Sequence, residues 1–178
     1  SHTDRLTNYI RFWQADGESQ KTSIRTKTAL GQMVEEGRFR GGNTPYGYRL
    51  KKSGILNKRK HEVYMLVIDE DEARIVRMMF DLCVSADYGR WRLANFLNDQ
   101  GIKNRKGENW HDASVGGILH NPLYKGILRS GETHAGPFEE IQIIDPEYFD
   151  LAQKLMLERT IERKDRRTVA LNTTGQSL

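Results

Sequence analysis

The chain has 178 residues, of which 37% are hydrophobic and 29% are charged, with a net charge of +4 and a pI of about 9.2. This length allows one domain with an extension, and the hydrophobic share is low enough that we expect part of the chain to lie outside the core. No apolar run approaches the roughly 18 residues of a membrane span. Cys83 is the single cysteine, so no internal disulfide can form. We therefore expect no membrane association and a reducing, cytoplasmic location.

Basic residues are concentrated between residues 21 and 60. This window holds eleven Lys and Arg residues against two Glu residues, a net charge of +9, which leaves −5 for the rest of the chain. Such asymmetry indicates that one region binds a polyanion, most often nucleic acid. The alternative is a solvated basic surface. Double-stranded DNA is the partner that we expect, with no cofactor.

The first segment, residues 1–36, is predicted to be a long helix. Four apolar residues recur at helical spacing: Leu6, Tyr9, Ile10 and Trp13. Gly37 is placed to end the helix. The segment is too polar to form a core of its own, so it needs a partner. Lys21, Arg25 and Lys27 are placed to contact phosphates if the helix lies along DNA.

Residues 37–48 form a Gly/Arg-rich linker, around which the rest of the chain is organised. Four glycines and a proline in twelve residues prevent a helix or a central strand. The guanidinium groups of Arg38 and Arg40 and the amide of Asn43 suit the narrow minor groove, where the potential is negative. A solvated hinge between two domains is the alternative, and residues 37–48 alone leave both interpretations open.

Residues 49–160 are predicted to form a compact DNA-binding domain. Two short strands, 48–56 and 62–68, flank a basic turn of Lys58, Arg59 and Lys60, which is either a phosphate clamp or a soluble hairpin tip. Asp69 is expected to cap the next helix in a capping box with Glu72.

A helix over residues 88–98, in which Trp91, Ala94 and Leu97 recur, a basic turn with Arg105 and Lys106, and a short helix over 112–119 follow. Strand-like runs at 124–129 and 140–144 complete the order of a winged helix. The short helix would enter the major groove. Its exposed residues are expected to be His111, Ser114, Gly117 and His120, although packing of the domain alone would explain any single one of them.

Asp145 and Pro146 begin a last helix whose apolar pattern dissolves past Glu158. The mixed-charge stretch that follows is predicted to be a helical extension leading to a linker, and residues 161–178 are expected to be a polar tail that leads to an absent C-terminal module. The predicted fold class is α+β, mainly α: a long N-terminal helix followed by a compact winged-helix-like domain with short β-hairpins.

No catalytic constellation is recognisable. The five histidines are scattered, no set of carboxylates or thiols completes a metal site, and neither a P-loop nor a G-x-S-x-G motif occurs. The sequence therefore predicts binding rather than chemistry for these residues.

The order of these features resembles the large serine recombinases, which integrate and excise phages and transposons. The matching residues include Thr44-Pro45-Tyr46-Gly47-Tyr48, Glu72-Ala73-Arg74-Ile75-Val76, and the series Trp110, Val115, Ile118-Leu119, Asn121-Pro122, Tyr124 and Gly126. The resemblance covers roughly residues 15–160. It implies a connector helix and a recombinase domain that binds an attachment half-site in a dimer or tetramer of the full-length protein.

In that family the nucleophilic serine lies in a separate N-terminal domain, and a zinc ribbon usually follows the recombinase domain. Neither the catalytic domain nor the zinc ribbon is recognisable in these residues, so we expect the chain itself not to cut DNA. Two other hypotheses stay open: a stand-alone winged-helix transcriptional regulator, and an interaction module that uses its long helix to bind a partner other than DNA.

Overall fold

The computed structural model describes the backbone of residues 2–39, 41–56 and 60–174 and the side chains of residues 18–39, 41–56 and 60–164. In chain order its elements are α1 (His2–Glu35), β1 (Tyr48–Leu56), β2 (Glu62–Ile68), α2 (Glu70–Ser85), α3 (Arg90–Asp99), α4 (Asp112–Leu119), η1 (Pro122–Lys125), β3 (Leu128–Ser130), β4 (Thr133–Ala135), η2 (Glu139–Ile141) and α5 (Pro146–Thr174). The predicted class, mainly α with two small antiparallel strand pairs, is confirmed.

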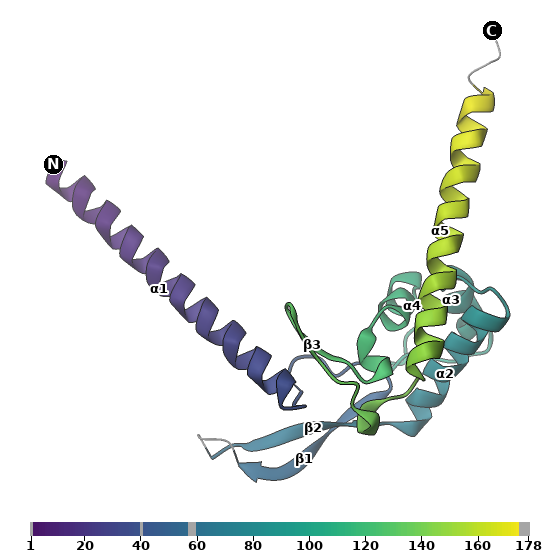
Figure 1. Ribbon diagram of the computed structural model, residues 1–178, viewed down its shortest axis with the longest axis horizontal. Helices are drawn as coiled ribbons and strands as arrows, with labels where there is room; N and C mark the ends of the chain where they lie inside the picture. Colours follow the sequence, from purple (N-terminus) through teal and green to yellow (C-terminus); the bar gives the residue numbers. More distant parts are fainter. Residues whose placement is uncertain (1, 40, 57–59, 175–178) are drawn as a thin grey trace.

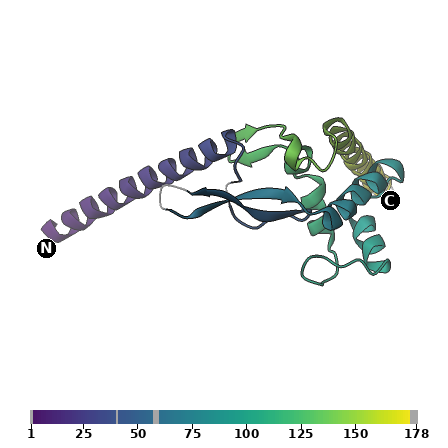
Figure 2. The ribbon, with the colours of Figure 1, turned by 90° about the horizontal axis from the view of Figure 1, so that it is seen from below.

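The long helices α1 and α5 leave a small body as two diverging arms, and α4 and β3 lie between them (Figure 1). In the perpendicular view, the β1–β2 hairpin projects from the body on the same side as α1 (Figure 2). Among the described residues, no helix combines the length and the apolar content that crossing a membrane requires.

The core is centred on α2. Its inner face carries Val76, Met79, Phe80 and Cys83, all fully buried, because they recur at helical spacing. The Phe80 ring packs against the Phe149 ring of α5 with centroids 5.5 Å apart. Cys83 is thus a core residue, as its apolar context predicted.

The start of α2 differs from the expected capping box. The Asp69 carboxylate accepts a hydrogen bond from the Glu72 backbone N–H (3.3 Å), as predicted. The Glu72 carboxylate does not return the bond to Asp69. It accepts from the Gly47 N–H instead (2.7 Å), while the Asp69 N–H donates to the Gly47 carbonyl (2.9 Å). Both ends of the motif therefore tie α2 to the linker that precedes β1.

In α3, Trp91 is not buried with Ala94 and Leu97, the other two residues that recur at helical spacing. Its side chain is 70% exposed, whereas Leu93, Ala94 and Leu97 are buried. Because residues three apart in a helix lie about 60° apart around its axis, Trp91 shares an edge with Ala94 yet falls outside the face centred on Leu93 and Leu97.

The second hairpin lies at residues 128–135 rather than in the two predicted strands, 124–129 and 140–144. Asn121 caps a 3-10 turn through its side chain, and Gly126, with φ of +84°, ends that turn, so the chain is not extended before Leu128. Ile141, Ile143 and Ile144 are buried against the core, and this burial produced the strand-like apolar pattern. The Ile143 and Ile144 N–H groups both donate to the Tyr124 carbonyl.

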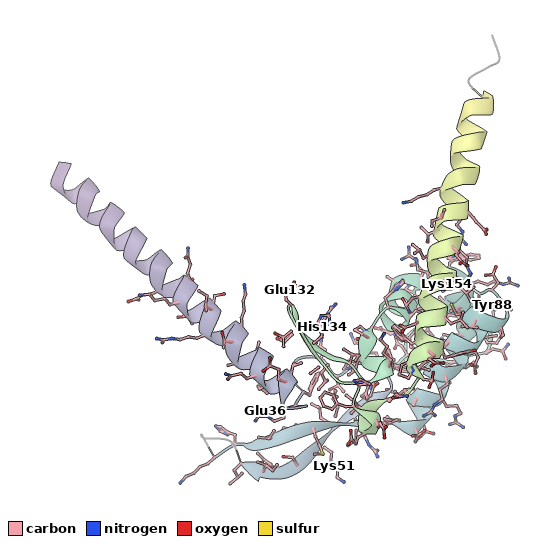
Figure 3. All side chains as sticks on the ribbon, viewed as in Figure 1. Glu36, Lys51, Tyr88, Glu132, His134 and Lys154 are labelled. Atoms are coloured by element: carbon pink, nitrogen blue, oxygen red, sulfur yellow. The ribbon has the colours of Figure 1, made fainter. Side chains whose placement is uncertain are left out.

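The β3–β4 hairpin packs against the C-terminal end of α1. Gly31 of α1 is buried, and a Cβ atom there would lie 3.1 Å from the Thr133 hydroxyl. Val34, one turn later, is 1% exposed. Glu132 lies in the turn of the same hairpin, and His134 lies in β4, where it pairs with Arg129 (Figure 3). The hairpin therefore holds the C-terminal end of the long helix against the body.

Helix α5 begins as predicted, since the Asp145 carboxylate accepts from the N–H groups of Glu147 (2.9 Å) and Tyr148 (3.2 Å). The helix continues past Glu158 to Thr174, in agreement with the predicted helical extension.

Candidate nucleic-acid interface

Helix α4 has one exposed stripe opposite a buried face. His111, Ser114, Gly117 and His120 are exposed, while Val115, Ile118 and Leu119 are buried beneath them. The stripe is formed because these four positions are three residues apart. Space is open around Gly117, since no atom lies within 4 Å of the position that its Cβ would take. A large partner can therefore approach the helix closely here.

The described part of residues 37–43, which we call the strap, connects α1 to the body. Gly37, with φ of +71°, ends α1 in a Schellman motif: its N–H donates to the Val34 carbonyl (2.9 Å), and the Arg38 N–H donates to the Met33 carbonyl (2.8 Å). Gly41 and Gly42 also have positive φ values, of +90° and +96°, and nothing lies within 4 Å of their Cβ positions. Only glycine takes up these two conformations without strain.

The strap and α4 face each other across an open groove of about 590 Å³. Its lining includes Asn43 from the strap, Gly117 and His120 from α4, and Arg129 from β3. The groove therefore brings together Asn43 and His120, two residues predicted to contact DNA that lie more than 70 positions apart in the sequence.

The turn that follows the strap, residues 44–48, is fixed to the body. The Tyr124 hydroxyl donates to the Tyr46 carbonyl (2.6 Å), and the buried Tyr48 hydroxyl donates to the carbonyls of Leu123 (3.1 Å) and Ile141 (2.7 Å). Gly47 has φ of +91° and a Cβ there would lie 2.9 Å from Ile143, so this close approach requires glycine. The predicted linker thus has two parts, of which the second is part of the domain.

Arg105 holds the same turn from the other side. Its guanidinium donates to the Glu72 carboxylate through Nε (2.8 Å) and also through Nη2, to the Thr44 carbonyl (2.9 Å) and to the Tyr48 carbonyl (2.7 Å). The hydrogen bond to Glu72 raises the pKa of Arg105 above its ordinary value. Sequence reasoning assigned Arg105 to DNA and missed this internal role, because Glu72 lies 33 residues away. A DNA contact by Arg105 stays a prediction.

The tyrosines of this cluster are held neutral. Burial, together with the Glu72 charge, raises the pKa of Tyr46 to about 12. Burial also raises the pKa values of Tyr48 and Tyr124 well above the ordinary tyrosine value. Neutral phenols and a charged guanidinium at neutral pH are suited to holding the turn, because their hydrogen bonds persist across the physiological range.

The other predicted contacts are dispersed. Lys106 and Lys60 are exposed on separate loops. Arg38 is paired with Glu36. Arg40, Lys58 and Arg59 lie outside the described residues. The ring of His120 is hydrogen-bonded to Gln153 of α5 (2.8 Å).

On α1, Lys21 and Arg25 lie four residues apart on one face, and both are exposed. Lys27 lies on a different face. It is four and seven residues from Gly31 and Val34, so it shares the side of α1 that packs against the hairpin. The Thr22 hydroxyl, next to Lys21, donates to the Glu18 carbonyl within the helix (2.9 Å).

Among the described residues, no group of three His, Cys, Asp or Glu side chains is placed to hold a metal ion.

Comparison with known proteins finds one family model. The model described as Recombinase matches residues 70–159, which run from the start of α2 to the middle of α5. The uncharacterized immunity region protein 5 of Bacillus phage phi105 is 34% identical over 77 residues, which are 43% of this chain and 56% of that protein.

Two solved structures share the fold. A crystal structure of an LSR–DNA complex (LSR, large serine recombinase) is 21% identical, with a TM-score of 0.57 over 75% of this chain and 38% of that chain. A structure described as "Sequence Requirements of the Listeria innocua prophage attP site" is also 21% identical, with a TM-score of 0.54 over 74% of this chain and 51% of that chain. The chain spans about half the length, or less, of the proteins that it matches.

Proposed function

Because the chain belongs to the Recombinase family, we propose that it is the DNA-recognition part of a large serine site-specific recombinase, and that it binds an attachment half-site for integration or excision. The observation that carries this proposal is the groove between the strap and α4, which gathers Asn43, Gly117 and His120. The fold that it shares with the structure of an LSR–DNA complex supports it.

In the proposed complex, α4 lies in the major groove. Its exposed stripe is made of small and imidazole side chains, which allow close approach and can hydrogen-bond to base edges. The strap follows the adjacent backbone or minor groove, where Asn43 and the two linker arginines make contact. The duplex then lies in the angle between α1 and the body, where Lys27 faces it.

The chemistry of recombination would belong to a serine nucleophile in a separate catalytic domain. That serine would form a 5′-phosphoserine link, and strands would be exchanged in a tetramer. The recombinase domain would contribute site recognition and the orientation of the long helix.

A selection experiment tests the proposal. The chain is equilibrated with a pool of randomised duplexes, the bound fraction is sequenced, and the enriched duplex and a shuffled version of it are titrated at matched salt. We expect the enriched duplex to bind at least 10³-fold more tightly, the lower end for specific DNA-binding proteins. Equal affinity for both duplexes would overturn the proposed site recognition.

A second candidate is a stand-alone DNA-binding regulator, which would use the same exposed stripe of α4 and the same strap. The two functions differ in what the whole gene product does. A recombinase joins two sites in a plasmid recombination assay, whereas a regulator changes expression from a promoter that contains the enriched site and leaves the plasmid unrearranged.

A further inference from the structure

A second groove, of about 450 Å³, lies along α4 and opens toward α5. On the α4 side it is lined by Gly116, Leu119 and His120. On the other side it is lined by α5, with Arg90 of α3 at one end. His120 lines both this groove and the groove next to the strap. The C-terminal half of helix α4 therefore lines two grooves, one toward the strap and one toward α5.

Helix α5 is fixed in its position beside α4. The Gln153 side-chain amide donates to the Leu119 carbonyl (2.7 Å), and its oxygen is hydrogen-bonded to the His120 ring (2.8 Å). Met156, Thr160 and Arg163 follow Gln153 at helical spacing and line the same groove. The contact at Gln153 thus determines which residues of the extended helix face α4.

The lining of this groove is basic. It contains three arginines and one lysine, and it contains no carboxylate. Arg159 has an internal role, because its guanidinium donates to the Cys83 carbonyl (2.5 Å) and the Tyr88 carbonyl (3.3 Å) and pairs with Asp87. Arg90 pairs with Asp112 at 3.3 Å. Arg163 lines the groove and is exposed, and its Nη2 lies 3.7 Å from the position that a Cβ at Gly89 would take.

We propose that the α5 side of this groove, with Arg163 as its principal residue, is a phosphate-contact surface for the DNA strand opposite the one that the strap follows. This inference rests on the proposed function. A helix in the major groove lies between two sugar-phosphate backbones, because that groove is only about 12 Å wide. The strap reaches one backbone, and α5 is the element on the other flank of α4.

Phosphate contacts are independent of base sequence, and each one releases counterions. Replacement of Arg163 should therefore weaken binding to the enriched and shuffled duplexes by the same factor. It should also reduce the slope of log K against log salt concentration by about 0.9. Because Arg163 is exposed, Arg163→Gln should leave the melting temperature unchanged.

Lys154 provides a matched control. It is an exposed cation on the same helix, nine residues before Arg163, which places it half a turn away around the helix axis (Figure 3). Lys154→Gln removes the same charge from α5 and should change neither the affinity nor the salt slope.

The possible results separate the two proposals. If the wild-type chain binds no duplex, the proposed function fails. If the wild-type chain binds and Arg163→Gln has the wild-type slope, or if Lys154→Gln reduces the slope equally, the α5 surface is overturned and the proposed function stands. If Arg163→Gln changes the ratio between enriched and shuffled duplexes, Arg163 contacts bases and the phosphate assignment is wrong.

A duplex with single methylphosphonate substitutions locates the contact. We expect one position at which a neutral methylphosphonate lowers the affinity of the wild-type chain but does not lower the affinity of Arg163→Gln any further. It should lie on the strand opposite the one whose substitutions affect variants of the strap. Additive losses at every phosphate would contradict a direct contact.

Discussion

Arg105, in the turn between α3 and α4, forms an ion pair with Glu72 of α2 through two hydrogen bonds. The same guanidinium also contacts the backbone of residues 44–48. The guanidinium binds the carboxylate with one edge and the carbonyls of Thr44 and Tyr48 with its other donors. The pair therefore determines where the strap joins the domain.

Replacement of Arg105 by Ala should lower the free energy of unfolding by about 1–3 kcal/mol, since it leaves the Glu72 carboxylate and the carbonyl groups without a charged donor. Arg105→Lys should restore little of this stability, because an ammonium group cannot bind the carboxylate at two points and the carbonyl groups at the same time. Urea denaturation measures both effects. Lys106→Ala, at the exposed neighbour, should stay within about 0.5 kcal/mol of the wild type. If Arg105 contacted phosphate alone, Arg105→Ala would change the salt slope and leave stability unaltered.

Substitution at Gly117 should separate folding from binding. Gly117 lies inside α4 with open space around it, so Gly117→Ala should stabilise the chain by about 0.5–1 kcal/mol. Gly117→Leu should also fold, yet its side chain would stand between α4 and the DNA. We expect it to weaken binding at least tenfold, or about 1.4 kcal/mol, in a titration with the enriched duplex.

Gly126, unlike Gly117, has no room for a side chain. It has φ of +84°, and a Cβ there would lie 2.8 Å from the Phe138 carbonyl oxygen. Gly126→Ala should therefore cost about 1–3 kcal/mol of stability. Equal melting temperatures for Gly117→Ala and Gly126→Ala would contradict the described packing.

Tyr48 should make the chain sensitive to alkali. Burial raises its pKa in the folded state above the ordinary value of 10.0, so the folded chain keeps this proton while the unfolded chain loses it. The contribution of the neutral phenol is complete below pH 10, and stability then falls by about 1.4 kcal/mol per pH unit for this group as the pH rises further.

Tyr48→Phe tests this assignment by urea denaturation between pH 8 and 11. At pH 8 the variant should be less stable by about 1–3 kcal/mol, because the carbonyls of Leu123 and Ile141 lose their buried donor. Above pH 10 its stability should decline less steeply than that of the wild type. Parallel curves for the two proteins would exclude Tyr48 as the titrating group.

The contact between Gly31 and Thr133 should control the attachment of α1. Gly31→Val places a branched side chain where even a Cβ would be 3.1 Å from the Thr133 hydroxyl, so we expect the helix and the hairpin to separate. Hydrogen exchange of residues 30–35 should accelerate, while exchange in α2 stays unchanged. Adding Thr133→Ala should restore part of the protection. Unchanged exchange in Gly31→Val would argue against the contact.

Lys27 and Lys21 should differ in their effect on DNA binding. Lys27 shares the side of α1 that faces the body, and Lys21 lies about 120° away around the helix. If the duplex lies in the angle between α1 and the body, Lys27→Ala should reduce the salt slope by about 1 and Lys21→Ala should not. The reverse result would place the DNA on the outer side of α1.

Local signals in the sequence predicted much of this fold. The bounds of β1, β2 and α4 agree with the prediction, because alternation, helical spacing and capping residues act over a few positions. Asp145 and Pro146 begin α5 for the same reason. The exposed stripe of α4 followed from the period of its buried residues.

Longer-range relationships were not predictable in this way. Nothing near Arg105 in the sequence identifies Glu72 as its partner, so a basic loop residue was assigned to DNA. The 140–144 run alternates like a strand because its isoleucines are buried, although no ladder forms there. The helical extension past Glu158 was predicted, but nothing in the sequence placed Arg163 beside α4, so the groove between the two helices was missed.

The β3–β4 hairpin holds only the last turns of α1, and this has a thermodynamic consequence. Every residue from 18 to 29 is exposed, including Ile24 at 63%, so this part of the helix gains no burial from its own domain. A helix of this kind is marginal by itself in water. The affinity for any partner that lies along it is then reduced by the entropy of ordering these residues. Substitutions that raise helix propensity on the outer side of α1 should tighten binding without touching the partner.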